Sequence, residues 1–203
     1  MSTTQLAIAN MAIDMCAGDV IEDIPDGNKL EGLLIDRNWQ QCLETVLGEH
    51  DWCYFRTWVE LTEDTGYTFI DDTYTYAYEK PSDWARLDEQ ENRELDFTIR
   101  ANRILSNIDD MEIAYIAIPT IAAIDTTLYW PAYFNNALAA NIAMIINPKL
   151  NKKGARGKDF EKAYLAALQL AMMRDANEDR EAAERLTRHG SGTDSWINAR
   201  GGE

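Results

Sequence analysis

Histidine, cysteine and proline are scarce in this chain of 203 residues, which has two histidines, three cysteines and five prolines. Cys16, Cys42 and Cys53 are odd in number and form no CxxC pair, which argues against a disulfide framework. Three scattered cysteines and two histidines are also too few to supply a zinc site readily. Because the sequence shows no signal peptide, we expect reduced, buried thiols in a cytosolic setting, with no metal and no other cofactor.

The motifs of common catalytic sites are missing. The chain has no GxxxxGK[ST] phosphate loop, no GxGxxG after a strand, no GxSxG and no HExxH. A Ser–His–Asp site would have to use His50 or His189. His50 follows a predicted helix, where a cation interacts favourably with the helix dipole, and His189 begins a glycine-rich tail. The sequence therefore predicts that the protein is not an enzyme.

Positive charge is in the minority, with 19 Lys and Arg against 35 Asp and Glu and a formal net charge of −16. Residues 1–100 carry 22 acidic and 7 basic side chains, and residues 101–203 carry 13 and 12. Such an acidic first half repels nucleic acid and anionic membranes. The apolar stretch 137–146 contains Asn141 and is about half of the ~20 residues that cross a bilayer. We therefore expect no membrane partner.

The stretch 130–150 predicts a helix around which the rest of the chain is organised. Pro131 suits the first helical turn, and Pro148 is expected to mark the far end. Apolar residues recur at spacings of three and four, and alanines fill the other faces. A helix that is apolar nearly all round must be covered on most sides, so we expect a buried central helix.

Hydrophobic periodicity predicts further helices and a β region between them. Helices are expected over 5–17, with Gly18 in the C′ position, and over a segment ending near residue 49. The run PSDWARL is expected to form a single helical turn. Alternating residues predict strands over 51–61, 67–78, 95–99 and 111–119.

A long helix follows over 158–188, with an apolar stripe that includes Ala163, Tyr164, Leu170 and Ala171. We predict a mainly α fold: a helical bundle of two N-terminal and two C-terminal helices, with a small inserted antiparallel β region and a flexible C-terminal arm. The predicted boundaries are a single domain over 1–188, with helices in 4–50 and 131–188 and the β region at about 51–120, and an arm over 189–203.

Two segments near the C-terminus carry candidate contact residues. The first is a basic loop. A solvated loop is the simpler interpretation, but the segment could also touch DNA phosphates or an acidic partner through Lys149, Lys152, Lys153, Arg156 and Lys158. The arm carries Trp196, Ile197 and Arg200, and tryptophan and arginine are common hot-spot residues. A disordered tail needs no tryptophan, so we expect these three residues to dock on a partner.

Two pairs of adjacent aspartates, Asp71–Asp72 and Asp109–Asp110, could be imagined as a two-metal nuclease site. Neighbouring side chains beside a strand point to opposite faces, so roles as turn residues explain both pairs better. Aromatic side chains are dense over 52–84. Stacking of bases on them would need interleaved basic residues, so packing of a small sheet on helices is the preferred interpretation.

Several motifs follow one another in order along nearly the whole chain. A glycine and an Ile–Asp loop join the first two predicted helices, and a Trp–aromatic segment follows; these positions are Gly18, Ile21 or Ile24, Asp26, Trp52, Tyr54 and Phe55. The next motif consists of Tyr74, Tyr76, Pro81, Asp83 and Arg86, and the run YWPAYF and the ending DSWINAR complete the pattern. The pattern resembles the head-to-tail adaptors of short-tailed bacteriophages, also called tail tubular protein A or head completion proteins.

The resemblance implies a structural role in the virion, at the head–tail junction, for a protein made in the host cytoplasm. Such adaptors form a dodecameric ring under the portal protein, close the DNA-filled head and carry the distal tail or nozzle protein. Their C-terminal arm grips the portal, which would give Trp196, Ile197 and Arg200 a task. DNA passes through the channel without specific binding, and acidic residues lining the lumen would repel its phosphates.

Two alternatives remain open at the level of sequence. One is a small acidic metal-dependent nuclease that uses the aspartate pairs. The other is a binding module that mimics DNA, which the acidic first half would allow.

Overall fold

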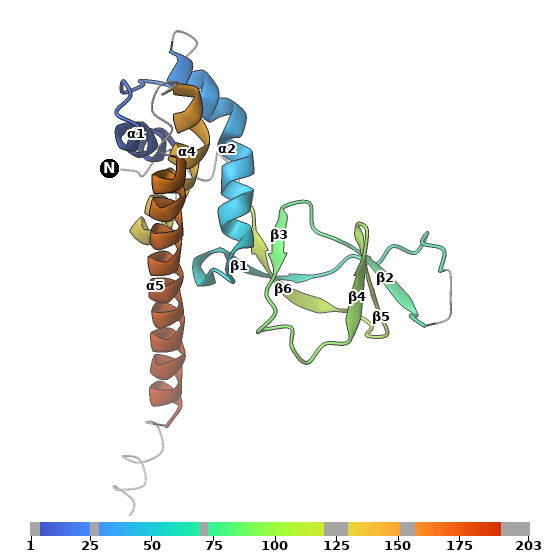
Figure 1. Cartoon of the computed structure of the whole chain (residues 1–203). Coiled ribbons are helices and arrows are strands. Elements are labelled where there is room, and N and C mark those ends of the chain that lie inside the picture. Colours follow the sequence, from blue (N-terminus) through green and yellow to red (C-terminus); the bar gives the residue numbers. More distant parts are fainter. Residues whose placement is uncertain (1–4, 25–28, 70–72, 120–129, 151–156, 192–203) are drawn as a thin grey trace, which may run out of the picture.

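Four helices make up one half of the computed structural model (Figure 1). The structure describes residues 5–24, 29–69, 73–119, 130–150 and 157–191. Within them, the chain begins with two helices and ends with two others, and we call these four elements the helical half. Their bounds are α1 (Gln5–Met15), α2 (Leu30–Gly48), α4 (Ala132–Leu150) and α5 (Gly157–Ser191).

The chain between α2 and α4 forms a β lobe that projects sideways from the helices (Figure 1). A short 3-10 turn, η1 (Cys53–Phe55), leads into it. In its described residues the lobe has six strands: β1 (Arg56–Glu60), β2 (Tyr76–Glu79), β3 (Trp84–Leu87), β4 (Phe97–Arg100), β5 (Arg103–Ser106) and β6 (Glu112–Ala117). They form two antiparallel three-stranded sheets, in the orders β1-β6-β3 and β2-β5-β4.

The predicted fold class, a mainly α helical bundle with a small β insert, is wrong, because the described residues form a mixed α/β structure with two complete sheets. The prediction missed two strands of four residues each. The run PSDWARL contains β3 rather than a helical turn, because Trp84 and Leu87 pair with β6. Residues Arg103–Ser106, for which no strand was predicted, form β5, the central strand of the second sheet. Strands this short carry little periodicity of their own and are fixed by their partners.

Helix α4 is the centre of the main core, as predicted. Helices α1, α2 and α5 all pack against it. Phe134, Leu138 and Ala143 are fully buried, and Ile142 is 1% exposed. One boundary differs from the prediction, because α4 continues past Pro148 to Leu150. Proline lacks an N–H group and so weakens the last turn without forbidding it.

The end of α1 differs by one residue from the prediction that Gly18 occupies C′. Ala17 has the left-handed φ of 53°. The N–H of Gly18 donates to Ile13 O at 3.1 Å, and the N–H of Ala17 donates to Asp14 O at 3.1 Å, which is the Schellman arrangement with Ala17 at C′. A Cβ at Gly18 would lie 3.0 Å from Ile13 Cγ2, a tight contact that a larger residue could make only if Ile13 shifted.

Helix α5 presents a narrower buried stripe than predicted. Tyr164, Leu168, Ala171 and Asp175 are buried, while Leu170 is 49% exposed. These buried positions recur at spacings of four, three and four along one helical face. The helix extends to Ser191, beyond the predicted start of the arm at 189.

The β lobe has a small core of its own, separate from the helical core. Its buried side chains are Leu61, Tyr78, Ile104, Met111 and Ile113. The phenol of Tyr78 donates to Ile108 O at 2.7 Å, so its polar end is satisfied inside the lobe. The lobe therefore needs specific contacts to hold it in a fixed position against the helices.

None of the helices in the described part of the chain has the length and apolar character needed to span a membrane.

Candidate functional site at the joint between the helices and the β lobe

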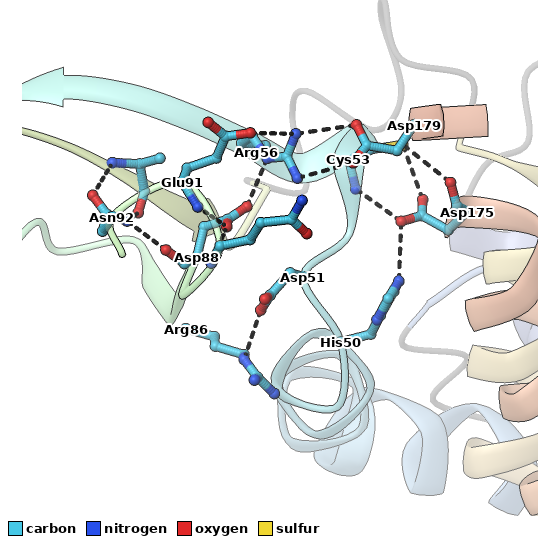
Figure 2. A network of polar contacts seen from close by, with 12 residues as sticks. His50, Asp51, Cys53, Arg56, Arg86, Asp88, Glu91, Asn92, Asp175 and Asp179 are labelled. Atoms are coloured by element: carbon cyan, nitrogen blue, oxygen red, sulfur yellow. Dashed lines mark hydrogen bonds and ion pairs between the residues drawn. The ribbon is translucent and has the colours of Figure 1, made fainter. Parts of the chain in front are cut away.

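A network of charged side chains joins the β lobe to α2 and α5 (Figure 2). The chain leaves α2 at Gly48 and enters β1 at Arg56, and η1 packs beside α5 on the way. We call this region the joint. Its polar residues come from the end of α2, from η1 and β1, from the segment after β3 and from α5.

Asp175 is the buried anchor on the α5 side. It is 1% exposed, and its carboxylate accepts the backbone N–H of Cys53 at 2.9 Å. His50 Nε2 lies 3.2 Å from Asp175 Oδ2, and Cys53 Sγ lies 3.2 Å from Oδ1. Burial alone would raise the pKa of Asp175, but the hydrogen bonds from His50, Cys53 and Tyr133 outweigh burial and lower it. The site therefore stabilises Asp175 in its charged form.

Tyr133 of α4 reaches the same carboxylate from the opposite side. Its hydroxyl lies 3.1 Å from Asp175 Oδ1 and 2.9 Å from Glu178 Oε2. A phenol has one proton to donate, so it serves one of these two acceptors at a time. Burial and the two neighbouring carboxylates raise the pKa of Tyr133, so the phenol stays protonated.

Arg56 is the cation that bridges the lobe and α5. Its Nε donates to Asp88 Oδ2 at 2.6 Å, and its Nη1 donates to Asp179 Oδ1 of α5 at 3.2 Å (Figure 2). Asp88 is fully buried and also accepts the N–H groups of Gln90 and Glu91, so it holds its own loop as well. Burial disfavours the charge on Arg56, but the hydrogen bonds to Asp88 and Asp179 outweigh it and raise the pKa of the guanidinium.

A second arginine ties β3 to the end of α2. Arg86 Nε lies 2.8 Å from Asp51 Oδ1, and Nη1 donates to Gly48 O at 3.0 Å. The carbonyl of Gly48 belongs to the last turn of α2, where carbonyls have no partner within the helix. Arg86 thus satisfies a helix end while it fixes the strand.

Aromatic rings fill the apolar side of the joint. Trp52 and Phe134 meet edge to face with centroids 5.1 Å apart, and Phe55 lies 5.6 Å from Trp130 in the same manner. The indole N–H of Trp52 donates to Val46 O at 2.9 Å. Trp52 and Phe55, two of the aromatic residues in the predicted packing of sheet on helices, lie before β1 and pack against Phe134 of α4. Beside them lies a polar cavity of about 340 Å³ lined by His50, Asp51, Arg56, Gln90, Asp175, Ala176, Asp179 and Arg180.

The chemistry of the joint favours positioning over reaction. A cysteine nucleophile must reach its thiolate form, but burial and the hydrogen bond to Asp175 raise the pKa of Cys53 to about 12. His50 is directed at Asp175 (Figure 2), which corrects the prediction that it acts on the helix dipole. Within the described residues, no group of three or more His, Cys, Asp and Glu side chains is arranged to hold a metal ion.

The second aspartate pair behaves as a turn. The carboxylate of Asp109 accepts the N–H of Asp110 at 3.0 Å, and Asp110 has a φ of 48°. Aspartate tolerates this left-handed conformation better than most residues. The first pair, Asp71–Asp72, lies outside the described residues.

The predicted contact residues are not part of the joint. Lys149 is exposed near the end of α4, and Lys158 is exposed in the first turn of α5. The other members of the basic loop, Lys152, Lys153 and Arg156, and all of the predicted docking residues, Trp196, Ile197 and Arg200, lie outside the described residues.

Sequence reasoning missed the residues that do meet at the joint. One signal was present: Asp175 continues the buried stripe of α5, where a carboxylate requires partners. Arg56 gave no such signal, because its position in an alternating strand is typical of an exposed residue. Asp88 belongs to the polar run DEQENRE, whose composition is typical of a surface loop, yet it is fully buried.

The fold and the joint define a two-part mixed α/β protein whose buried charges position one part on the other. A comparison of the chain with family models finds none that matches. A comparison with curated proteins also finds no match.

Proposed function

We propose that the protein is a structural virion protein, a head-to-tail adaptor that forms a dodecameric ring under the portal. In this role it closes the DNA-filled head, provides the tail attachment platform and surrounds the DNA channel. The observation that carries the proposal is the location of the residues behind the sequence resemblance. Trp52, Phe55, Arg86 and Trp130 lie where the lobe meets the helices, whereas Gly18 follows α1 and Tyr76 belongs to β2 of the second sheet.

Four of these motif residues make contacts that fix the geometry of the subunit. Trp52 and Trp130 pack on Phe134 of the central helix. Arg86 joins β3 to α2, and Asp83 accepts the phenol of Tyr115 at 2.9 Å. A ring protein needs a constant angle between its parts, because a small error in each subunit prevents closure. A ring protein therefore requires residues that hold the lobe at a constant angle to the helices.

The partners follow from this role. The arm with Trp196, Ile197 and Arg200 contacts the portal protein, and the distal tail or nozzle protein binds the opposite side of the ring. The excess of acidic residues lets DNA pass without specific binding, because carboxylates in the lumen repel phosphates. The protein is made in the host cytoplasm and ends at the head–tail junction of the virion.

Co-sedimentation with portal particles tests the proposal. The full chain should sediment with them, and a chain truncated after Ser191, which keeps all of α5, should stay in the supernatant. Trp196→Ala should reduce the bound fraction by about tenfold or more, as expected for a hot-spot tryptophan. Asn198→Ala in the same arm is the matched control and should bind normally.

Two outcomes would contradict the proposal. The adaptor role fails if the full chain stays free and small in the presence of portal particles. Nuclease activity that is lost on replacing Asp71 and Asp72 with asparagine would support the enzyme instead.

A further inference from the structure

Trp58 stands out on the surface of the β lobe. It belongs to β1, which lies at one edge of the sheet β1-β6-β3, and its side chain is 51% exposed. Beside it is a hollow of about 520 Å³ lined by Trp58, Gln90, Glu91, Arg93, Glu94, Leu95 and Glu112. A large exposed aromatic ring beside a hollow and on an edge strand is typical of a docking surface.

The lining of the hollow suits a cationic side chain. Its lining holds the exposed side chains of Glu91, Glu94 and Glu112 against one cation, Arg93, so carboxylates are in excess beside Trp58. Glu60 lies two residues further along β1 and therefore on the same face as Trp58. An indole face with carboxylates around it attracts lysine and arginine through the ring quadrupole and through charge. The lobe already contains one such contact, since Lys80 Nζ lies 5.1 Å from the ring centroid of Trp84.

The chain carries a cationic segment of matching chemistry. Lys149 is exposed near the end of α4, and Lys158 is exposed at the start of α5. The sequence between them adds Lys152, Lys153 and Arg156. The end of α4 lies near the top of Figure 1, whereas the lobe projects from the lower end of α2. The two complementary features thus lie on different parts of one copy. They are placed to join different copies in a head-to-tail contact, which closes into a ring when the rotation permits.

We propose that the hollow beside Trp58 receives the basic segment 149–158 of a second copy of this chain. The inference rests on the proposed ring assembly, to which it adds a specific contact between neighbouring subunits. The lysines and Arg156 place their charges among the carboxylates of Glu94 and Glu112, and one of them lies over the indole of Trp58. The contact weakens as salt is added, because exposed charges are screened.

Binding of a labelled peptide of residues 148–159 to the free full chain tests the inference without portal particles. Fluorescence anisotropy should show salt-dependent binding. Trp58→Ala should weaken it by about tenfold, and Trp58→Phe should retain most of it, since a phenyl ring also attracts cations. The double variant Glu94→Lys and Glu112→Lys should abolish binding of the natural peptide and restore it for a peptide with Lys152 and Lys153 replaced by glutamate.

A matched control changes the net charge equally at a distance from the hollow. Glu22→Lys with Glu44→Lys alters two exposed residues of the helical half and should leave peptide binding unchanged at moderate salt. Equal binding by the wild type, the Trp58→Ala variant and the charge-reversed variant would overturn the inference. Equal binding of a scrambled peptide would overturn the choice of this segment as the occupant.

The same variants in the portal assay separate this inference from the proposed function. If the full chain fails to bind portal particles while the peptide results hold, the adaptor role is wrong and the contact between copies stands. If the full chain binds portals and the charge-reversed variant binds them in the same copy number, the adaptor role stands and the contact is wrong.

Discussion

The carboxylate of Asp175 accepts the backbone N–H of Cys53 at 2.9 Å, although 122 positions separate them in the sequence. One bond therefore ties the C-terminal helix to the chain as it enters the β lobe. Because Asp175 is buried and charged, its loss would leave the N–H of Cys53 and the side chain of His50 without their acceptor. The joint depends on this residue more than on any exposed ion pair.

Asp175 predicts a specific dependence of stability on pH. Its pKa is lowered in the folded state from an ordinary value of 3.8, so folding favours the carboxylate. The stabilisation is complete above the ordinary pKa and is lost as the pH falls through the lower folded value. Urea unfolding of the wild type and of Asp175→Asn should give a free-energy difference that shrinks as the pH falls from 6 to about 2.5. A difference that stays constant over this range would contradict the assignment.

Arg56 and Arg86 predict different costs for the same substitution. Arg56→Ala leaves the fully buried Asp88 without its cation, so the free energy of unfolding should fall by about 3–5 kcal/mol. Arg86 and Asp51 are more exposed, and Arg86→Ala should cost about 1 kcal/mol. Denaturant melts of both variants measure the difference, and equal costs would show that the buried pair of Arg56 and Asp88 is not the stronger contact.

The elements that could be predicted from the sequence are those with long, strong periodicity. The central helix has apolar residues on nearly every face over 19 residues, and its burial follows from that pattern alone. Strands β3 and β5 have four residues each and depend on pairing with β6 and with β2 and β4, which a local pattern cannot reveal. The mixed α/β class was missed for this reason.

The joint was harder to predict than the fold. Its members come from the chain between α2 and β1, from β3 and the segment after it, from α4 and from α5, and each is unremarkable in its own segment. Asp175 alone broke a local rule, as a carboxylate on a buried helical stripe. Arg56 and Asp88 can be recognised as partners only in the folded chain, where Arg56 Nε lies 2.6 Å from Asp88 Oδ2.

The cysteines should be slow to react in the native protein. Burial raises the pKa of Cys16 to about 11 and that of Cys42 to about 12, and burial with the bond to Asp175 raises that of Cys53 to about 12. The thiolate is the reactive form, so iodoacetamide at neutral pH should label all three only after unfolding. Mass spectrometry of labelled protein checks this. Rapid native labelling of Cys53 would revive a nucleophilic role for the joint.

Two substitutions to aspartate compare the core with the helix surface. Ile142 is 1% exposed at the centre of α4, so Ile142→Asp should unfold the protein by burying an unpaired charge. Leu165 is 48% exposed on α5, and Leu165→Asp should change the free energy of unfolding by about 0.5 kcal/mol or less. Circular dichroism melts distinguish the outcomes. A folded Ile142→Asp variant would overturn the assignment of α4 as the centre of the core.

The adaptor role is tested most directly by electron microscopy of portal particles mixed with the full chain, followed by rotational averaging along the portal axis. The account predicts a ring of twelve copies on one face of the portal, with the tip of the C-terminal helix directed toward it. Portal particles that remain bare while the chain stays monomeric, or that carry bound chains without rotational symmetry, would contradict it.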